Sequence, residues 1–431
     1  MGVNWFRRAQ RVWLGVLTAV ALVGGCGQAA ERADRTPSPS PTRSTIIAAQ
    51  TPAAGSPGPS SPAASPSKQP ATNTAVPTGA HSPSPTRPAP ATASAAPSAG
   101  ERSFAFGKPV VIAPRDCGNI AVAQQSDTTI GGFIGCNDGL RYIEGTAGRW
   151  RAVRSPYQGQ ILAVDADAKQ TLLLFTTSSG GRPSLGRRLA NGQFEPAVAL
   201  GTSSAETDGA VVLSGRDWRA VWVEREAADQ AASTALYEAS SSFSRRRVNS
   251  ASPAQEGTPH LAATDAGELR LAYDSADPAS TNLVFATATA VTSAWSPMRS
   301  LHRAKSSHAP RLAVDGARTY VAFLNGVVPT LGELSTPASA MVTKDFRTDE
   351  GASNVRVAVS SGVPVIGWTA PRGVDGDGSD IDTAERREGR WYTQRFAAPG
   401  PHEDDVLREL LSARGRATGI AYGATLFARS Q

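Results

Sequence analysis

The sequence predicts an all-β fold, a β-propeller in which blades of four antiparallel strands repeat around a ring. Three observations lead to this prediction. From residue 101 onward, short apolar alternations are broken by Gly, Asp, Ser and Asn, without a long stretch of helical periodicity. A unit recurs along this region at intervals of about 50 residues. The first and last segments of the region together complete one repeat.

The first 25 residues have the pattern of an export signal. Arg7, Arg8 and Arg11 precede an apolar run over residues 12–23, and no acidic residue accompanies them. This run of about a dozen residues is shorter than the ~20 that a membrane-spanning helix requires. We therefore expect residues 1–25 to be a signal peptide.

The signal ends in Val23-Gly24-Gly25-Cys26, which resembles the bacterial lipobox, with Val where Leu is commonest. The resemblance implies a lipoprotein in which Cys26 becomes the new N-terminus and carries palmitate and related acyl chains. Two or more such chains anchor a protein stably. We expect the mature chain to lie outside the cytoplasm, held to the bacterial cell membrane. The alternative is ordinary cleavage near Gly27-Gln28-Ala29, which gives a secreted protein.

Residues 26–100 predict a disordered tether rich in Pro, Ser, Thr and Ala. Fifteen prolines lie between residues 31 and 100, and this stretch has no aromatic residue. Such a segment cannot bury enough apolar surface to offset its chain entropy. Extended at about 3.1 Å per residue, the tether would reach roughly 200 Å. Its Ser and Thr beside Pro also suit O-glycosylation.

The region 101–431 is expected to be the folded domain, and its charge is balanced. Of 43 basic and 37 acidic residues in the chain, eight basic and two acidic residues precede residue 101, so 35 of each remain. Nucleic-acid binding requires a basic folded face, so we expect no nucleic-acid partner. We expect a monomer whose interactions are insensitive to salt.

Two ladders of aromatic residues define the repeat. In each copy an apolar alternation, a tight turn and a second alternation end in one of Phe133, Phe175, Trp222, Tyr273, Phe323, Trp368 and Tyr422. Turn positions 165, 215, 265 and 315 lie 50 residues apart. The second ladder, where a third strand should turn into a fourth, is Trp150, Phe194, Phe243, Trp295, Phe346 and Trp391. We expect both ladders to fill the space between blades.

The two ends of this region predict how the ring closes. Residues 106–112 repeat a fourth-strand phrase without a preceding partner, and residues 425–429 read as a third strand without a fourth. We therefore expect seven blades, with N- and C-terminal strands sharing the last one. Six blades stay open as a count, and a sandwich of unrelated hairpins is the structural alternative.

The cysteines after Cys26 predict a disulfide. Cys117 and Cys136 lie equally far from an expected hairpin turn at Ser126-Asp127, so strict pairing places them opposite each other. Outside the cytoplasm such a pair oxidises. The alternative is two free buried thiols.

One acidic loop is a candidate calcium site. Asp375, Asp377, Ser379, Asp380 and Asp382 offer oxygen ligands spaced by Gly. Ser379 takes a ligand position of the familiar Asp-x-Asp-x-Asp-Gly loop, and Asp380 replaces its Gly. A solvated acidic loop without metal is the competing interpretation. No other cofactor is predicted.

Gly148-Arg-Trp150 and Gly389-Arg-Trp391 resemble fragments of the Asp-box of sialidase-like propellers, without its Asp and with a shorter spacing. The resemblance extends over 101–431 at the level of architecture only. It implies a propeller and, as one activity, a glycoside hydrolase or lyase with arginines and a Tyr–Glu pair at the ring centre. Arg311, Arg356 and Arg408, near the openings of first strands, are the candidates to clamp a carboxylate.

Other observations favour binding over catalysis. Tyr157, Tyr273, Tyr320 and Tyr422 mostly fall on the packing ladders, and the sequence has no nucleophile elbow or His-Glu-x-x-His run. His260, His302, His308 and His402 lie near blade starts or in loops. We expect a cell-envelope lipoprotein that displays a propeller to bind a protein, glycan or wall polymer. No catalytic residue is identified.

Overall fold

The computed structural model describes residues 110–428, apart from 113–116, 127, 147–148, 179–180, 202–204, 226–232, 250–254, 278, 349–350, 361, 372–378, 398–406, 413–417 and 423–424. The expected signal, Cys26 and the expected tether lie outside the described residues. Within the described part of the chain, no helix is long and apolar enough to cross a membrane.

The all-β propeller with four-stranded blades is confirmed. The first blade contains β2 (Cys117–Gln124), β3 (Ile130–Cys136), β4 (Gly139–Thr146) and β5 (Arg149–Arg154). The second contains β6 (Gly159–Ala166), β7 (Gln170–Thr177), β8 (Pro183–Leu189) and β9 (Phe194–Ala199). The third contains β10 (Ala205–Ser214), β11 (Asp217–Arg225), β12 (Thr234–Ser240) and β13 (Phe243–Arg247).

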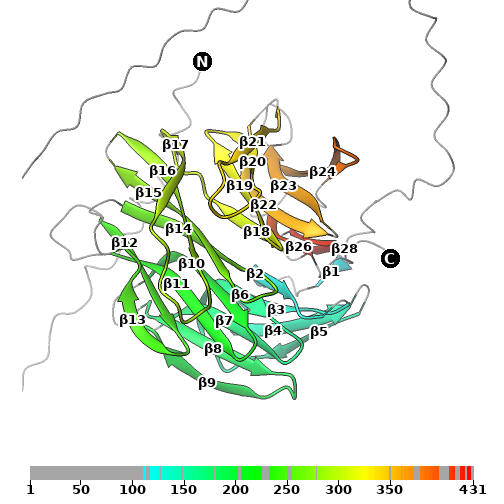
Figure 1. Ribbon diagram of the computed structural model, residues 1–431. Helices are drawn as coiled ribbons and strands as arrows, with labels where there is room; N and C mark the ends of the chain where they lie inside the picture. Colours follow the sequence, from blue (N-terminus) through cyan, green and yellow to red (C-terminus); the bar gives the residue numbers. More distant parts are fainter. Residues whose placement is uncertain are drawn as a thin grey trace, which may run out of the picture. The chain divides into compact units, whose positions relative to one another are not determined.

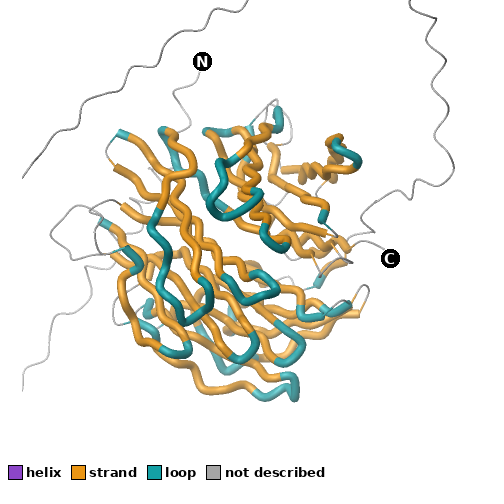
Figure 2. The backbone as a smooth tube through the Cα atoms, viewed as in Figure 1, coloured by secondary structure: helices purple, strands orange, loops and turns teal. Residues whose placement is uncertain are grey.

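Three further blades follow the same antiparallel order. The fourth contains β14 (Gln255–Ala263), β15 (Leu269–Asp277), β16 (Ser280–Ala288) and β17 (Arg299–Ala304). The fifth contains β18 (Arg311–Asp315), β19 (Arg318–Asn325), β20 (Val328–Leu334) and β21 (Val342–Asp345). The sixth contains β22 (Ser353–Ser360), β23 (Val363–Pro371), β24 (Ser379–Arg387) and β25 (Arg390–Ala397). Figure 2 shows short turns between some of these strands and longer described loops between others, such as the one from β16 to β17.

Among the described residues, six blades are each built from four strands that follow one another in the sequence, whereas seven blades were expected. One more sheet joins the two ends of the region. It contains β1 (Val110–Val111), β26 (Leu407–Ser412), β27 (Thr418–Tyr422) and β28 (Thr425–Ala428), in the order β1-β28-β27-β26. The β1–β28 pair matches Val110 with Leu426 and Val111 with Thr425, so the two ends pair as the sequence predicted.

The first strand of each sheet lies at the middle of the domain. The strands β2, β6, β10, β14, β18 and β22 contact one another in sequence order, and β26 contacts both β22 and β2. Figure 1 shows these strands gathered near the centre, with β5, β9, β13, β17 and β21 at the periphery. Almost every first strand also has an irregular register with its second strand, as in β14 between Gly257 and His260. Such bulges bend a strand and redirect its side chains.

The predicted disulfide between Cys117 and Cys136 is confirmed. The hairpin register differs in detail from the prediction, because Gln124 pairs with Ile130, one residue away from the expected match. A bulge between Cys117 and Ile120 then places the two cysteines opposite each other. The bulge therefore compensates for the displaced turn.

The described members of the first aromatic ladder are packing residues, as predicted, and the side chain of Tyr422 lies outside the described residues. Phe133, Phe175, Trp222, Tyr273, Phe323 and Trp368 are at most 2% exposed. The second ladder begins fourth strands at Phe194 and Phe243, whereas Trp295 precedes β17 and Phe346 follows β21. Its residues pack against arginines, as where the Arg219 guanidinium lies 3.9 Å from the Trp295 ring centre. Cation–π contact therefore joins apolar packing between blades.

Candidate functional site

The first strands surround a cavity of about 1060 Å³. Its walls come from β2, β6, β10, β14, β18, β22 and β26, so it lies at the ring centre. Small and apolar residues such as Ala163, Val212 and Ala262 form much of the lining. Neither Tyr nor Glu is among the described lining residues. The described lining therefore contains no Tyr–Glu pair of the kind that the sialidase-like resemblance implied.

Carboxylates line the cavity where the first strands reach their turns. Asp165 lies one residue before the end of β6, Asp265 follows β14 and Asp315 ends β18, while Asp167 and Lys169 follow β6. Asp165 accepts hydrogen bonds from the backbone N–H of Leu213 at 2.7 Å and of Ala166 at 2.9 Å. Burial nevertheless raises the pKa of Asp165 to about 6. This carboxyl group can exchange a proton near neutral pH.

Cationic groups gather nearer the entry of the first strands. His260, Arg311 and Arg356 occupy equivalent positions in the fourth, fifth and sixth blades. They pair across to the small residues Ala272, Ala322 and Gly367, respectively. His260 and Arg311 line the cavity, and Arg311 and Arg356 both act electrostatically on His260. We call these three residues the cationic mouth.

Backbone geometry sets the direction of these residues. Two positions before each, Thr258, Ala309 and Asn354 have φ values of 46°, 45° and 49°. Non-glycine residues rarely adopt such left-handed conformations, which persist only where the surroundings enforce them. The same distortion therefore recurs at the entry of three neighbouring blades.

His260 is held neutral at the blade junction. Its Nδ1 accepts a hydrogen bond from the Leu312 N–H of the next blade at 3.2 Å, so the ring proton resides on Nε2. Burial lowers the pKa of His260 well below its ordinary value, and the charges of Arg311 and Arg356 lower it further. The mouth thus combines a neutral N–H donor with two guanidinium groups, a combination suited to an anion.

The sequence grouped Arg408 with Arg311 and Arg356, and the strand register corrects this. β26 has an irregularity between Leu407 and Glu409, and Glu409 pairs with Ala421. Glu409 therefore takes the position equivalent to Arg311, and Arg408 lies in the irregularity. Sequence alone could not reveal a one-residue bulge.

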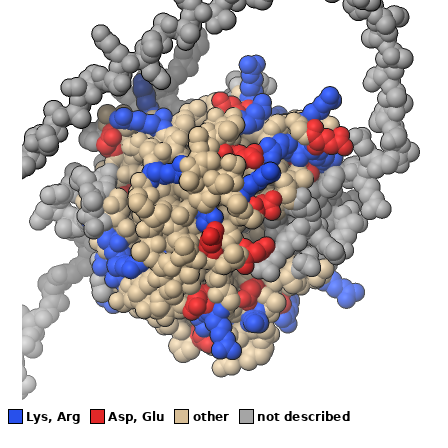
Figure 3. Space-filling model, viewed as in Figure 1, with Lys and Arg blue, Asp and Glu red and all other residues tan. Residues whose placement is uncertain are grey.

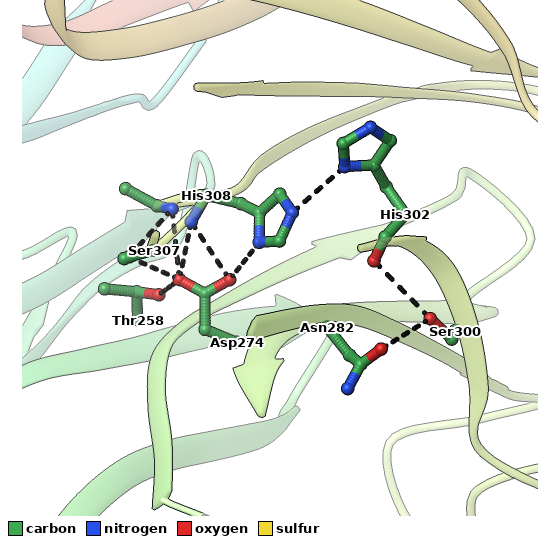
Figure 4. Close-up of polar contacts among 8 residues, drawn as sticks. Thr258, Asp274, Asn282, Ser300, His302, Ser307 and His308 are labelled. Atoms are coloured by element: carbon green, nitrogen blue, oxygen red, sulfur yellow. Dashed lines mark hydrogen bonds and ion pairs between the residues drawn. The ribbon is translucent and has the colours of Figure 1, made fainter. Parts of the chain in front are cut away.

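A second polar cluster is centred on Asp274 (Figure 4). Asp274 on β15 is 5% exposed and accepts hydrogen bonds from Thr258 Oγ1 at 2.8 Å and Ser307 Oγ at 2.5 Å. The backbone N–H groups of His308 and Ala309 donate to it at 3.0 and 3.1 Å. Burial raises the pKa of Asp274, but hydrogen bonds from His308, Ser307 and Thr258 outweigh it and hold the pKa below its usual value.

Two histidines extend this cluster. His308, fully buried, contacts Asp274 Oδ1 through Nδ1 at 2.9 Å and His302 Nδ1 through Nε2 at 3.1 Å. Both rings lie near Phe323 of the fifth blade. Burial and His308 lower the pKa of His302, while Asp345 opposes them. We call Asp274, His308 and His302 the Asp274 relay. The sequence placed these histidines near blade starts or in loops, whereas His302 lies in β17, and Asp274 was not predicted.

The remaining candidates are placed as follows. Asp375 and Asp377 lie outside the described residues, and so does His402. Ser379, Asp380 and Asp382 belong to β24, where Asp382 accepts two hydrogen bonds from Arg395, at 2.8 and 2.9 Å. Among the described residues, no group of three or more His, Cys, Asp or Glu could hold a metal ion. The calcium site stays a prediction.

The predicted tyrosine packing and charge balance also have structural counterparts. Tyr157, Tyr273 and Tyr320 are at most 3% exposed and belong to hydrophobic clusters. Figure 3 shows Lys and Arg interspersed with Asp and Glu on the visible face.

The sequence matches no family model, and no curated protein matches it. Similar solved structures include a prolyl endopeptidase, with 10% identity and TM-score 0.48 over 72% of this chain and 47% of that chain. The sialidase of Trypanosoma rangeli matches with 10% identity and TM-score 0.43 over 66% of this chain and 56% of that one.

An α-L-arabinanase of Penicillium chrysogenum matches with 10% identity and TM-score 0.44, over 61% of this chain and 94% of that chain. This chain thus spans about half the length of the endopeptidase and the sialidase. The likeness concerns the fold alone and says nothing of activity.

Proposed function

We propose that this protein is an envelope lipoprotein whose propeller binds an anionic group of a protein, glycan or wall polymer without catalysing a reaction. The cationic mouth is the observation that carries the proposal. His260, Arg311 and Arg356 occupy equivalent positions in three neighbouring blades, beside the central cavity. Guanidinium groups bind carboxylates, sulfates and phosphates with directional hydrogen bonds.

The proposed position in the cell rests on the N-terminal sequence. The charged n-region, the short apolar run and the Gly24-Gly25-Cys26 segment support lipidation of Cys26. Replacing Cys26 with Ser should move the protein from the membrane fraction to the soluble envelope or medium. Retention of the variant in the membrane fraction would refute lipid anchoring.

Closure of the ring matters for binding, because the first strands carry the residues of the cationic mouth and must be held in place. We propose that the sheet of β1 and β26–β28 acts as a seventh, closing blade. Contacts of β26 with both β22 and β2 support this role. A ring closed by strands from both ends holds its inner strands in place without a covalent link.

Binding can be tested with a defined acidic probe. We expect trigalacturonate to bind the full-length chain in calorimetry, and neutral maltotriose not to bind. Arg311→Gln should weaken trigalacturonate binding at least about tenfold, since a charge-assisted hydrogen bond contributes about 1.5–3 kcal/mol. Arg149→Gln on the exposed strand β5 is the matched loss of charge and should leave binding unchanged. Equal effects of both variants would exclude the mouth as the binding site.

A glycoside hydrolase or lyase is the second candidate, and Asp165 is the observation in its favour. A carboxyl group with a pKa of about 6 beside a cavity can act as a general acid. Incubation with acidic and neutral polysaccharides, followed by assay for new reducing ends and unsaturated products, tests this function. Turnover that is lost in Asp165→Asn would favour the enzyme over the binding protein.

A further inference from the structure

Asp274 connects the entries of two neighbouring blades. Its carboxylate accepts from Thr258 Oγ1, two residues before His260, and from the Ala309 N–H, two residues before Arg311. Both donors have positive φ values, 46° and 45°. These hydrogen bonds stabilise the unusual conformations that direct His260 and Arg311. One buried carboxylate thus helps to fix the orientation of two of the three residues of the cationic mouth.

The hydrogen bonds also fix where the protons of the relay reside. Asp274 is ionised and can only accept, so His308 Nδ1 carries a proton and donates it over 2.9 Å. The Nε2 of neutral His308 must then accept, and His302 Nδ1 donates to it over 3.1 Å. His302 Nε2 is then the ring nitrogen whose lone pair is not used in a hydrogen bond within the relay. The relay therefore has one defined arrangement when both rings are neutral.

The relay responds differently to a first and a second proton. The first enters at His302 Nε2 and leaves every hydrogen bond of the relay in place. The second must enter at His308 Nε2, which removes the acceptor of the His302–His308 bond and puts two cationic rings with centres 5.3 Å apart. Among the described residues, Asp274 contacts His308, and Asp345 of β21 acts electrostatically on His302.

We propose that the Asp274 relay is a proton-sensitive positioning device that holds the cationic mouth in its binding geometry and releases it when both histidines are protonated. This inference rests on the proposed function, since it concerns regulation of the same site. Double protonation displaces residues 307–309 and with them Arg311. A bound anion favours the ordered mouth, so anion binding and protonation of the relay oppose each other.

Anion affinity against pH separates the relay from simple titration of His260. Protonation of His260 alone would strengthen trigalacturonate binding as the pH falls. The relay predicts the reverse, a loss of about tenfold on acidification below pH 7 over the range in which the domain stays folded, within the usual range of coupling between sites. His308→Asn keeps a donor near the Nδ1 position but cannot take the second proton, so its loss should be less than about threefold. Arg149→Gln, an exposed position on β5 outside both the relay and the mouth, is the control and should keep the wild-type pH profile.

A readout without ligand distinguishes failure of the relay from failure of the proposed function. In full-length protein labelled with ¹⁵N-histidine and ¹⁵N-arginine, we expect scalar coupling across the His302–His308 hydrogen bond at pH 7 and its loss on acidification. The Arg311 amide signal should shift with that loss in wild type and stay in place in His308→Asn. The relay is overturned if no scalar coupling is seen at pH 7, or if the Arg311 amide signal does not shift when the coupling is lost. Coupling and shift without anion binding would support the relay and refute the proposed function.

Discussion

Arg219 and Glu238 show how single residues join blades in this domain. Both are at most 1% exposed, and Arg219 Nε donates to Glu238 Oε2 at 2.8 Å. Trp295 Nε1 of the fourth blade donates to the same oxygen at 2.8 Å, and Arg246 to the other at 2.7 Å. Every oxygen of this buried carboxylate therefore has a partner, as a charge inside a protein requires.

Glu238→Gln should destabilise the domain by about 3 kcal/mol, because it leaves Arg219 buried without its counter-charge. Denaturant unfolding measures the change. Glu195, which is 41% exposed and 3.5 Å from Arg187, provides the comparison. Glu195→Gln should cost less than about 1 kcal/mol, as exposed ion pairs do. Similar losses in both variants would contradict this account of the buried pair.

The lowered pKa values of two histidines lead us to expect that acid destabilises the domain. Folded-state pKa values of His260 and His302 are lowered, so the unfolded chain binds protons first, and stability is lost as the pH falls through about 6.5. Asp165, with a pKa raised to about 6, acts in the opposite sense below that pH. The thermal midpoint of unfolding should therefore fall as the pH is lowered from 7.5 to 6. His260→Gln should show a smaller fall, and an unchanged slope would argue against a buried neutral His260.

At the scale of elements, the β2–β3 hairpin carries a covalent tie. The disulfide closes a sequence separation of 19 residues within the first blade. Cross-linking lowers the entropy of the unfolded chain, and loops of this size gain about 3 kcal/mol. The double variant Cys117→Ala with Cys136→Ala should lose roughly that much in denaturant unfolding. Reduction of the wild type should lower stability similarly, and it should leave the double variant unaffected.

At the scale of the whole molecule, β1 is the one N-terminal strand in the sheet that joins the ends. Deleting residues 101–113 removes β1 and exposes the edge of β28. We expect the thermal midpoint to fall by several degrees, about 2–4 °C for each kcal/mol in a domain of this size. Deleting residues 30–42, in the expected tether, serves as the control and should leave the midpoint unchanged. An unchanged thermal midpoint in the variant that lacks β1 would exclude a role of this strand in closing the ring.

Patterns with a regular period were the part of this protein that sequence could predict. The turns near residues 165, 215, 265 and 315 and the buried ladder from Phe133 to Trp368 follow from strand alternation and a repeated unit. The Cys117–Cys136 pair followed from hairpin symmetry, although a bulge and a displaced turn had to cancel for it to form. Arg408 failed as a member of the mouth because another bulge shifted the register by one residue.

The sequence by itself determined the repeated strands, the packing aromatics and the pairing of the two ends of the region 101–431, because side-chain alternation and repeat length are local properties. The sequence grouped Arg311 with Arg356, but only the tertiary structure added His260 to them and revealed the Asp274 contacts at the entries of their strands. These residues come from different blades, and their meeting depends on bulges and left-handed residues at strand entries. A one-residue irregularity changes which side chain faces the cavity, and no periodic pattern in the sequence encodes it.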